Sequence, residues 1–193
     1  MAGRPRTFDR TTAVDRFRDL FWQKGYAGTS IDDLQAAAGI QRGSFYAAFQ
    51  DKESAYLEAL TLYANEFAKQ AEQALQSADG PRAGLAEFLR FAGRFLSAHT
   101  GMGCFLLSSI AQPPHLNETK TELFDRVTRT LRDPLEQACN DTRDAKQLRA
   151  HETANSLSAY ILCQVLGLNA LTRSGAKPAE IQSAANLAAD LIF

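Results

Sequence analysis

Helical periodicity runs through most of the chain and restricts it to an all-α fold. From residue 10 onward, apolar residues recur at the three- and four-residue spacing of a helix, and no segment alternates as a half-buried strand does. Glycine and proline divide this pattern into about nine helices. We predict helices over residues 10–24, 30–37, 41–48, 52–77, 81–99, 103–111, 117–143, 147–174 and 178–192. Pro134 lies inside the seventh and is expected to kink or break it.

Length and composition indicate one domain or two small ones with a hydrophobic core. The chain has 193 residues, of which 45% are hydrophobic and 22% charged, and this balance argues against disorder. No run reaches the roughly 18 consecutive apolar residues that a membrane-spanning helix needs. The charged N-terminus lacks the apolar stretch of a signal peptide. We therefore expect a soluble, cytoplasmic protein with no membrane partner.

The cysteines and histidines do not predict a metal site. There are three of each, at wide spacings, whereas structural zinc needs paired ligands close together in the sequence. An odd number of cysteines without short spacings also does not encode a disulfide framework. We expect no metal and no cofactor.

Positive charge is concentrated at the N-terminus. The formal net charge is −1, yet residues 1–52 hold eight Lys/Arg against six Asp/Glu, and residues 53–193 hold 13 against 16. Arg4 and Arg6 lie beside Gly3 and Pro5, on a segment expected to be extended. A basic arm of this kind can reach phosphates or a minor groove, and a solvated tail is an equally good explanation on this evidence alone.

Residues 10–52 have the pattern of a helix-turn-helix. Ser30 is placed as an N-cap with Asp33 three residues later, and Gly25 and Gly39 are placed to end helices. The second short helix, residues 41–48, is a candidate to enter a major groove, with Arg42 positioned to recognise a guanine edge. The alternative is a helical hairpin inside a larger bundle, and the pattern alone leaves both open. The candidate DNA-binding residues are Arg4, Arg6, Thr29, Arg42, Gly43, Ser44, Tyr46 and Lys52.

The segment from Thr29 to Leu60, TSIDDLQAAAGIQRGSFYAAFQDKESAYLEAL, resembles the DNA-binding segment of the tetracycline-repressor (TetR) family. Matching features include the alanine run before Gly39, the Gly-x-x-Tyr-x-x-Phe spacing and the Lys-Glu pair. The chain has Asp33-Leu34 where the family often has an alanine. The resemblance implies a homodimeric transcriptional regulator of double-stranded operator DNA, in most cases a repressor. It also implies a DNA-binding domain over residues 1–50 and an effector-binding and dimerisation domain over residues 51–193.

The predicted helix 81–99 carries an aromatic stripe. Phe88, Phe91 and Phe95 are spaced to share one face, which suits either core packing or the wall of a pocket for a small-molecule inducer. Phe124 and Tyr160, together with His99, are candidates to complete such a pocket from neighbouring helices.

The last two predicted helices, 147–174 and 178–192, are rich in alanine and leucine around most of their circumference. This is more apolar surface than one buried stripe needs, so we expect a four-helix interface in a homodimer. Central burial in a monomer is the alternative.

Cys104 follows Gly101 and Gly103 and lies in the first turn of the predicted helix 103–111, where a helix dipole stabilises a thiolate. Its Gly-Cys-Phe-Leu context resembles TetR-family members that sense electrophiles or oxidants. A buried, structural thiol is the alternative. An enzyme using Cys104 with His99 as base lacks an orienting third group in the sequence, so we expect no enzyme. A helical adaptor that does not bind DNA is the remaining alternative.

Overall fold

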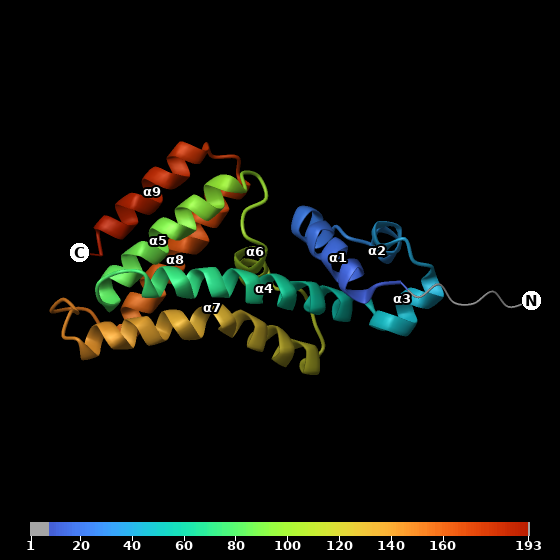
Figure 1. Cartoon of the computed structure of the whole chain (residues 1–193), viewed down its shortest axis with the longest axis horizontal. Helices are drawn as coiled ribbons and strands as arrows, with labels where there is room; N and C mark the ends of the chain where they lie inside the picture. The colour runs from blue at the N-terminus through green and yellow to red at the C-terminus, as the bar shows by residue number, and fades with distance from the viewer. Residues whose placement is uncertain (1–7, 193) are drawn as a thin grey trace, which may run out of the picture. The chain divides into compact units, whose positions relative to one another are not determined.

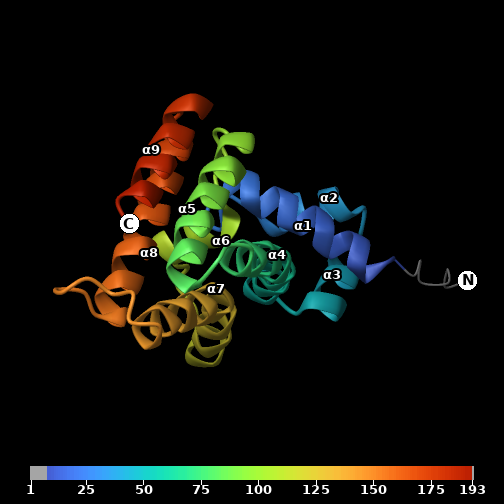
Figure 2. The same ribbon diagram turned by 60° about the vertical axis from the view of Figure 1, so that its left-hand side comes forward.

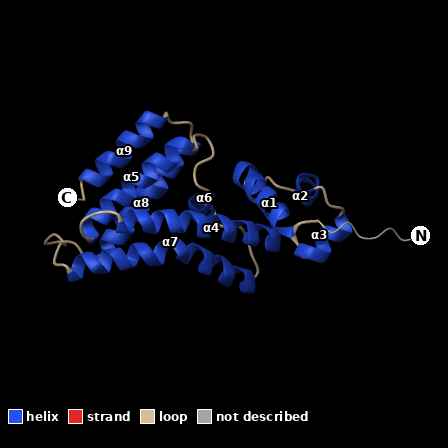
Figure 3. Ribbon diagram, viewed as in Figure 1, coloured by secondary structure: helices blue, strands red, loops and turns tan. Residues whose placement is uncertain are grey.

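The computed structural model describes residues 8–192, and within that range every regular element is a helix and none is a strand (Figure 3). This confirms the all-α prediction. Figure 1 labels the helices, which are α1 (Arg10–Lys24), α2 (Ile31–Ala38), α3 (Arg42–Phe49), α4 (Lys52–Gln76), α5 (Pro81–Ala98), α6 (Phe105–Ala111), α7 (Glu118–Asp144), α8 (Ala154–Arg173) and α9 (Pro178–Asp190).

The chain divides into two compact units. Unit 1 comprises residues 1–63 and 114–124, and unit 2 comprises residues 64–113 and 125–193. Helices α4 and α7 each contribute residues to both units. The first turns of α7 therefore fold with the N-terminal helices, although more than 50 residues separate them in the sequence from the end of the first segment of unit 1.

The core of unit 1 is aromatic. Phe17 of α1 meets Phe49 of α3 edge to face at 4.9 Å between ring centroids, and Phe21 meets Tyr56 of α4 in the same way at 5.1 Å. These side chains are almost completely buried. Edge-to-face pairs add to the stabilisation that burial alone provides, so the short helices α2 and α3 belong to a unit with a well-packed aromatic core.

Unit 2 is built around α5, which packs against α8 and α9, while α6 packs against α8 (Figures 1 and 2). The close approach of α5 and α9 depends on small residues, because a Cβ atom placed on Gly93 would lie 2.4 Å from the Cβ of Ala185. Leu85, Leu89 and Leu96 of α5 are fully buried. Of the predicted aromatic stripe on this helix, Phe88 is buried, whereas Phe91 and Phe95 are half-buried.

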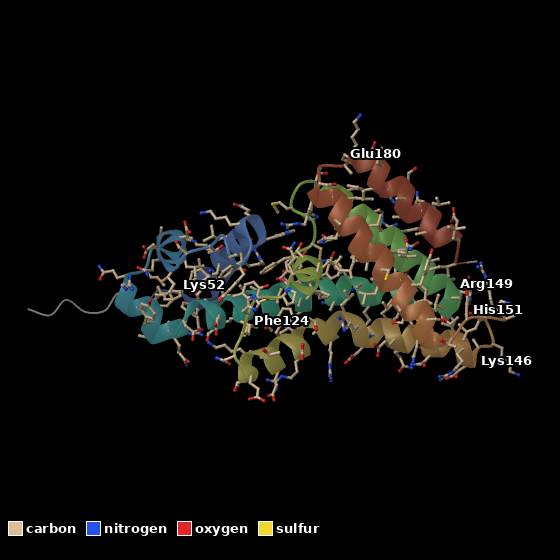
Figure 4. All side chains as sticks on the ribbon, turned by 180° about the vertical axis from the view of Figure 1, so that it is seen from behind. Lys52, Phe124, Lys146, Arg149, His151 and Glu180 are labelled. Atoms are coloured by element: carbon tan, nitrogen blue, oxygen red, sulfur yellow. The ribbon has the colours of Figure 1, made fainter. Side chains whose placement is uncertain are left out.

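One local prediction is wrong. Helix α8 begins at Ala154 and not at residue 147, because Thr153 and Ser156 form a capping box that starts a new helix, and Lys146 adopts a positive φ of 59°. The connection before α8, where Figure 4 labels Lys146, Arg149 and His151, is not regular helix. Of the two outcomes predicted at Pro134, a kink or a break, the break does not occur: helix α7 continues through Pro134, and Leu131 and Leu135 on either side are buried.

Candidate nucleic-acid interface

Helix α2 and the turn that follows it position α3, the candidate DNA-reading helix. The Ser30 hydroxyl accepts a hydrogen bond from the Asp33 N–H at 3.0 Å, and the Asp33 carboxylate accepts one from the Ser30 N–H at 2.8 Å. This confirms the predicted capping box. Gly39 ends α2 in the left-handed region at φ 67°, which a glycine adopts at no steric cost. Helix α3 then starts at Arg42, within one residue of the predicted position.

The exposed face of α3 carries four of the predicted DNA-binding residues. The Arg42 side chain is 70% exposed, with its guanidinium 3.9 Å from the carboxylate of Asp32 and 5.5 Å from the centre of the Tyr46 ring. Tyr46 is exposed, Ser44 is half-buried, and nothing lies within 4 Å of a Cβ built on Gly43. The structure therefore brings a cation, two hydroxyls and an open backbone position to one surface.

Lys52 lies at the first residue of α4, with its ammonium 4.2 Å from the centre of the Tyr26 ring (Figure 4). Partial burial lowers the pKa of Lys52, and the nearby charge of Asp33 opposes that change. The cation–π contact fixes the direction of a long side chain that would otherwise be mobile. A positioned ammonium is well suited to a phosphate oxygen.

Thr29 stands apart from this surface. Thr29 is buried, and its hydroxyl donates a hydrogen bond to the Gly25 carbonyl at 2.8 Å, so in this structure its side chain stabilises the turn after α1. Arg4 and Arg6 lie outside the described residues.

Two other arginines of unit 1 donate to backbone carbonyls near the ends of helices, which the sequence analysis did not anticipate. Arg10 pairs with Glu58 at 2.6 Å and donates to the Ala48 carbonyl at 2.6 Å, near the end of α3. Arg16 donates to the Ala37 carbonyl at 3.0 Å, near the end of α2. Cations that satisfy the last carbonyls of a helix also complement its dipole. No local sequence pattern distinguishes these arginines from ones that contact DNA.

The predicted effector residues do not all lie together. Phe91 and Phe95 pack with Phe67 of α4 at ring distances of 5.8 and 5.0 Å, and the His99 ring stacks on Phe95 at 4.4 Å. The partner that the sequence analysis missed is Phe67, which belongs to α4, a helix for which no effector-binding residue was predicted.

The other three predicted aromatic residues lie outside this cluster of rings. Phe88 is buried in α5, Phe124 belongs to unit 1, and Tyr160 is 37% exposed on α8. A hollow of about 420 Å³ runs along α7, and its lining is charged and polar instead of aromatic. It is lined by Asp125, Thr128, Arg129, Arg132, Asp133 and Glu136.

Cys104 is fully buried as the N-cap residue of α6. Its backbone N–H donates to the side-chain oxygen of Asn169 at 2.7 Å, and the Asn169 amide nitrogen donates to the Ser108 hydroxyl at 3.1 Å. The other cysteines differ from Cys104 and from each other. Burial raises the pKa of the Cys139 thiol to about 12, and Cys163 is exposed on α8. Within residues 8–192, no group of three or more His, Cys, Asp or Glu side chains is arranged to hold a metal ion.

Comparison with known proteins agrees with this geometry. The sequence profile of the family described as bacterial regulatory proteins, tetR family, matches residues 14–59. The transcriptional repressor ComR of Escherichia coli K12 is 30% identical over 177 residues, which cover 90% of this chain and 84% of ComR.

Solved structures extend the similarity over both units. A cysteine-substituted variant of the regulator CifR, solved with a 26-base-pair double-stranded operator DNA, is 28% identical with a TM-score of 0.76 over 97% of this chain and 98% of CifR. The reduced form of E. coli NemR has a TM-score of 0.76 at 20% identity, over 95% of this chain and 97% of NemR, and shares the fold.

A helix-turn-helix unit joined to a larger helical unit defines a one-component DNA-binding regulator. The chain belongs to the TetR family of transcriptional regulators. This family consists of regulators and not of enzymes, so the alternatives of a Cys104 enzyme and of an adaptor that does not bind DNA are set aside.

Proposed function

We propose that this regulator is a repressor that binds its operator as a homodimer in the cytoplasm, through the exposed face of α3 and the start of α4. The observation that carries the proposal is the placement of Arg42, Tyr46 and Lys52. Arg42 and Tyr46 lie on α3, which follows the capped helix α2, and Lys52 lies at the start of α4. Arg42 supplies the bidentate donor that recognises guanine, whereas Tyr46 and Lys52 are placed to contact phosphates. We keep the proposed domains, residues 1–50 for DNA binding and residues 51–193 for effector binding and dimerisation, with Lys52 at the junction between them.

Three substitutions on this surface are expected to separate affinity from sequence preference. Lys52→Ala and Tyr46→Ala should weaken binding to all duplexes alike, and Lys52→Ala should also reduce the slope of log affinity against log salt by about 0.9. Arg42→Ala should cost about 1–3 kcal/mol on the preferred duplex and relax the preference for one base. Fluorescence anisotropy with a duplex selected from random sequence by the wild-type protein measures both quantities. Unchanged affinity in all three folded variants would contradict the proposed interface.

The homodimer is proposed to form through α8 and α9. Leu171, Leu187 and Leu191 are 46%, 61% and 57% exposed, and the exposed stripe of α8 includes the small residues Ala159 and Gly167. Among residues 8–192, α8 alone is long and apolar enough to cross a membrane by length and composition, yet only 33% of its most apolar window is buried. Two copies of α8 and α9 packed as a four-helix interface would bury this apolar surface.

Replacing one exposed leucine by a charge tests the dimer. Leu187→Glu is expected to give a monomer at micromolar concentration, because the interface would have to bury an unpaired carboxylate. Leu123→Glu is the control, since Leu123 is 36% exposed on the α7 segment of unit 1 and lies outside the proposed interface. Sedimentation velocity distinguishes the two states. A Leu187→Glu protein that sediments as the wild type does would exclude this face as the interface.

We further propose that an effector bound or attached in unit 2 releases the DNA. The Phe67, Phe91 and Phe95 cluster and the buried Cys104 are the two candidate sites, and they fit a reversible aromatic ligand and an electrophile respectively. The cysteine substitutions in the CifR complex and the reduced state of the NemR structure direct attention to the thiol.

A mobility-shift experiment with the DNA flanking its own gene separates these two sites. Release by an electrophile, reversed by a reductant where the adduct is labile and absent in Cys104→Ser, supports the thiol. Release that persists in Cys104→Ser points to another site.

A further inference from the structure

Lys120 makes two short ion pairs inside unit 1. Its ammonium lies 2.6 Å from an oxygen of Asp51 and 2.9 Å from an oxygen of Glu53, and the Lys120 side chain is only 17% exposed. The Asn117 side chain accepts a hydrogen bond from the Lys120 backbone N–H at 3.1 Å, which fixes the first turn of α7. This first turn is therefore attached to the junction between α3 and α4, across nearly 70 residues of sequence.

Asp51 accepts hydrogen bonds from two different groups. Its other oxygen accepts a hydrogen bond from the Ser54 backbone N–H at 2.8 Å and so caps the start of α4. Burial opposes ionisation of Asp51, but the hydrogen bonds from Lys120 and Ser54 outweigh it and lower the pKa of Asp51. Burial likewise disfavours the charge on Lys120, and the hydrogen bonds to Asp51 and Glu53 outweigh it and raise the pKa of Lys120. Both partners are charged at neutral pH.

The two carboxylates flank the proposed phosphate contact. Asp51 and Glu53 immediately precede and follow Lys52, whose ammonium lies over the ring of Tyr26. Burial raises the pKa of Tyr26, and the nearby charges of Glu53 and Asp51 raise it further while that of Lys120 opposes them. Lys120 and Lys52 together balance the two carboxylates. Without Lys120, a net negative charge would remain where the DNA phosphates approach.

We propose that Lys120 is a positioning residue for DNA binding: it fixes the start of α4 and compensates Asp51 and Glu53, so that Lys52 stays available to a phosphate. Lys120 itself makes no DNA contact. Because α7 continues unbroken from Glu118 to Asp144, and residues 125–144 belong to unit 2, the ion pairs also connect the phosphate contact to a helix that extends into that unit.

The salt dependence of DNA binding tests this assignment. A fluorescein-labelled duplex of about 30 base pairs and random sequence is the probe, because phosphate contacts do not depend on sequence. Lys120→Met is expected to weaken binding about tenfold, a coupling of ordinary size, and to lower the salt slope by no more than the loss of the single Lys52 contact does. Lys52→Ala should reduce the slope by about 0.9, and adding Lys120→Met to Lys52→Ala should lower it no further, because Lys120 itself makes no phosphate contact. Lys120→Arg, which keeps the charge, should restore most of the affinity.

Two controls make the result decisive. Lys69→Met removes the same charge from an exposed position on α4 in unit 2, and is expected to change affinity by less than about twofold. Adding Glu53→Gln to Lys120→Met should recover part of the affinity, because one uncompensated carboxylate is removed. Lys120→Gln gives the same comparison if the methionine variant does not fold by circular dichroism. The proposal is overturned if Lys120→Met matches Lys69→Met, or if Lys120→Met lowers the salt slope further in the Lys52→Ala background, as loss of a second phosphate contact would.

Discussion

Arg82→Met is expected to lower the free energy of unfolding by about 3 kcal/mol, the lower end of the cost of breaking a buried ion pair from one side. The Arg82 side chain is 8% exposed and pairs with both oxygens of Glu152 at 2.8 and 3.1 Å. The guanidinium also donates to the backbone carbonyl of Gln147 at 2.6 Å and to that of Ile192 at 2.7 Å. Methionine keeps the unbranched apolar stem of the side chain but leaves the carboxylate and two carbonyls without this donor.

We expect the lower end of this range of destabilisation because the Glu152 side chain is 22% exposed and can regain some hydration. Arg90→Met is the matched control on the same helix, since Arg90 pairs with Asp190 at 2.9 Å with side chains 33% and 67% exposed. An exposed pair of this kind contributes about 0–1 kcal/mol. Urea denaturation followed by circular dichroism, at one protein concentration, compares the two variants. Equal losses of unfolding free energy in the two variants would show that the burial of Arg82 adds nothing to the contribution of its ion pair.

The same ion pair gives the wild type a pH dependence that the variant lacks. The hydrogen bond from Arg82 lowers the pKa of Glu152 below its ordinary value of 4.5, although burial opposes the shift. A carboxyl group with a lowered pKa stabilises the folded state above the ordinary value, and that contribution is lost as the pH falls through the lowered one. The stability difference between wild type and Arg82→Met should therefore be constant from pH 7 to pH 5.5 and shrink below pH 4.5.

Local signals in the sequence were sufficient to predict most helix boundaries. The Ser30 and Asp33 capping box and the left-handed Gly39 each depend on residues within a few positions, and both are confirmed. The start of α8 was wrong by seven residues for the converse reason. A Thr153 and Ser156 capping box is a weaker sequence signal than the apolar pattern around it, and the alanine and leucine content hid the irregular connection before it.

Contacts between distant residues were beyond sequence reasoning. Lys120 with Asp51, Arg82 with Glu152 and Asn169 with Cys104 each join residues 65 to 70 positions apart. Their spacing follows no helical or turn period, so nothing separates these side chains from ordinary solvated ones until the fold is known. The same limit applies to Thr29, whose motif position suggests a phosphate contact while its hydroxyl donates within the turn after α1.

Gly103→Ala is expected to cost about 3 kcal/mol, because it combines backbone strain with the displacement of a buried amide. Gly103 has a φ of 69°, and a Cβ placed on it would lie 2.4 Å from the side-chain oxygen of Asn169. Left-handed backbone costs a residue with a Cβ about 1–2 kcal/mol. Asn169 is 2% exposed, and moving it would break its hydrogen bonds with the Cys104 N–H and the Ser108 hydroxyl, at about 1–3 kcal/mol for buried groups left unpaired.

Gly101 supplies the control that separates these two costs. It lies in the same turn with a φ of 82°, and nothing is within 4 Å of a Cβ built there, so Gly101→Ala should show the backbone strain alone. In urea denaturation the excess loss in Gly103→Ala over Gly101→Ala then measures the displacement of Asn169. Combining Gly103→Ala with Asn169→Ala should cost less than the sum of the single changes, because the second removes the atom with which the first collides. Additive losses would show that the Cβ is accommodated without moving Asn169, and that this amide does not hold the backbone in front of Cys104.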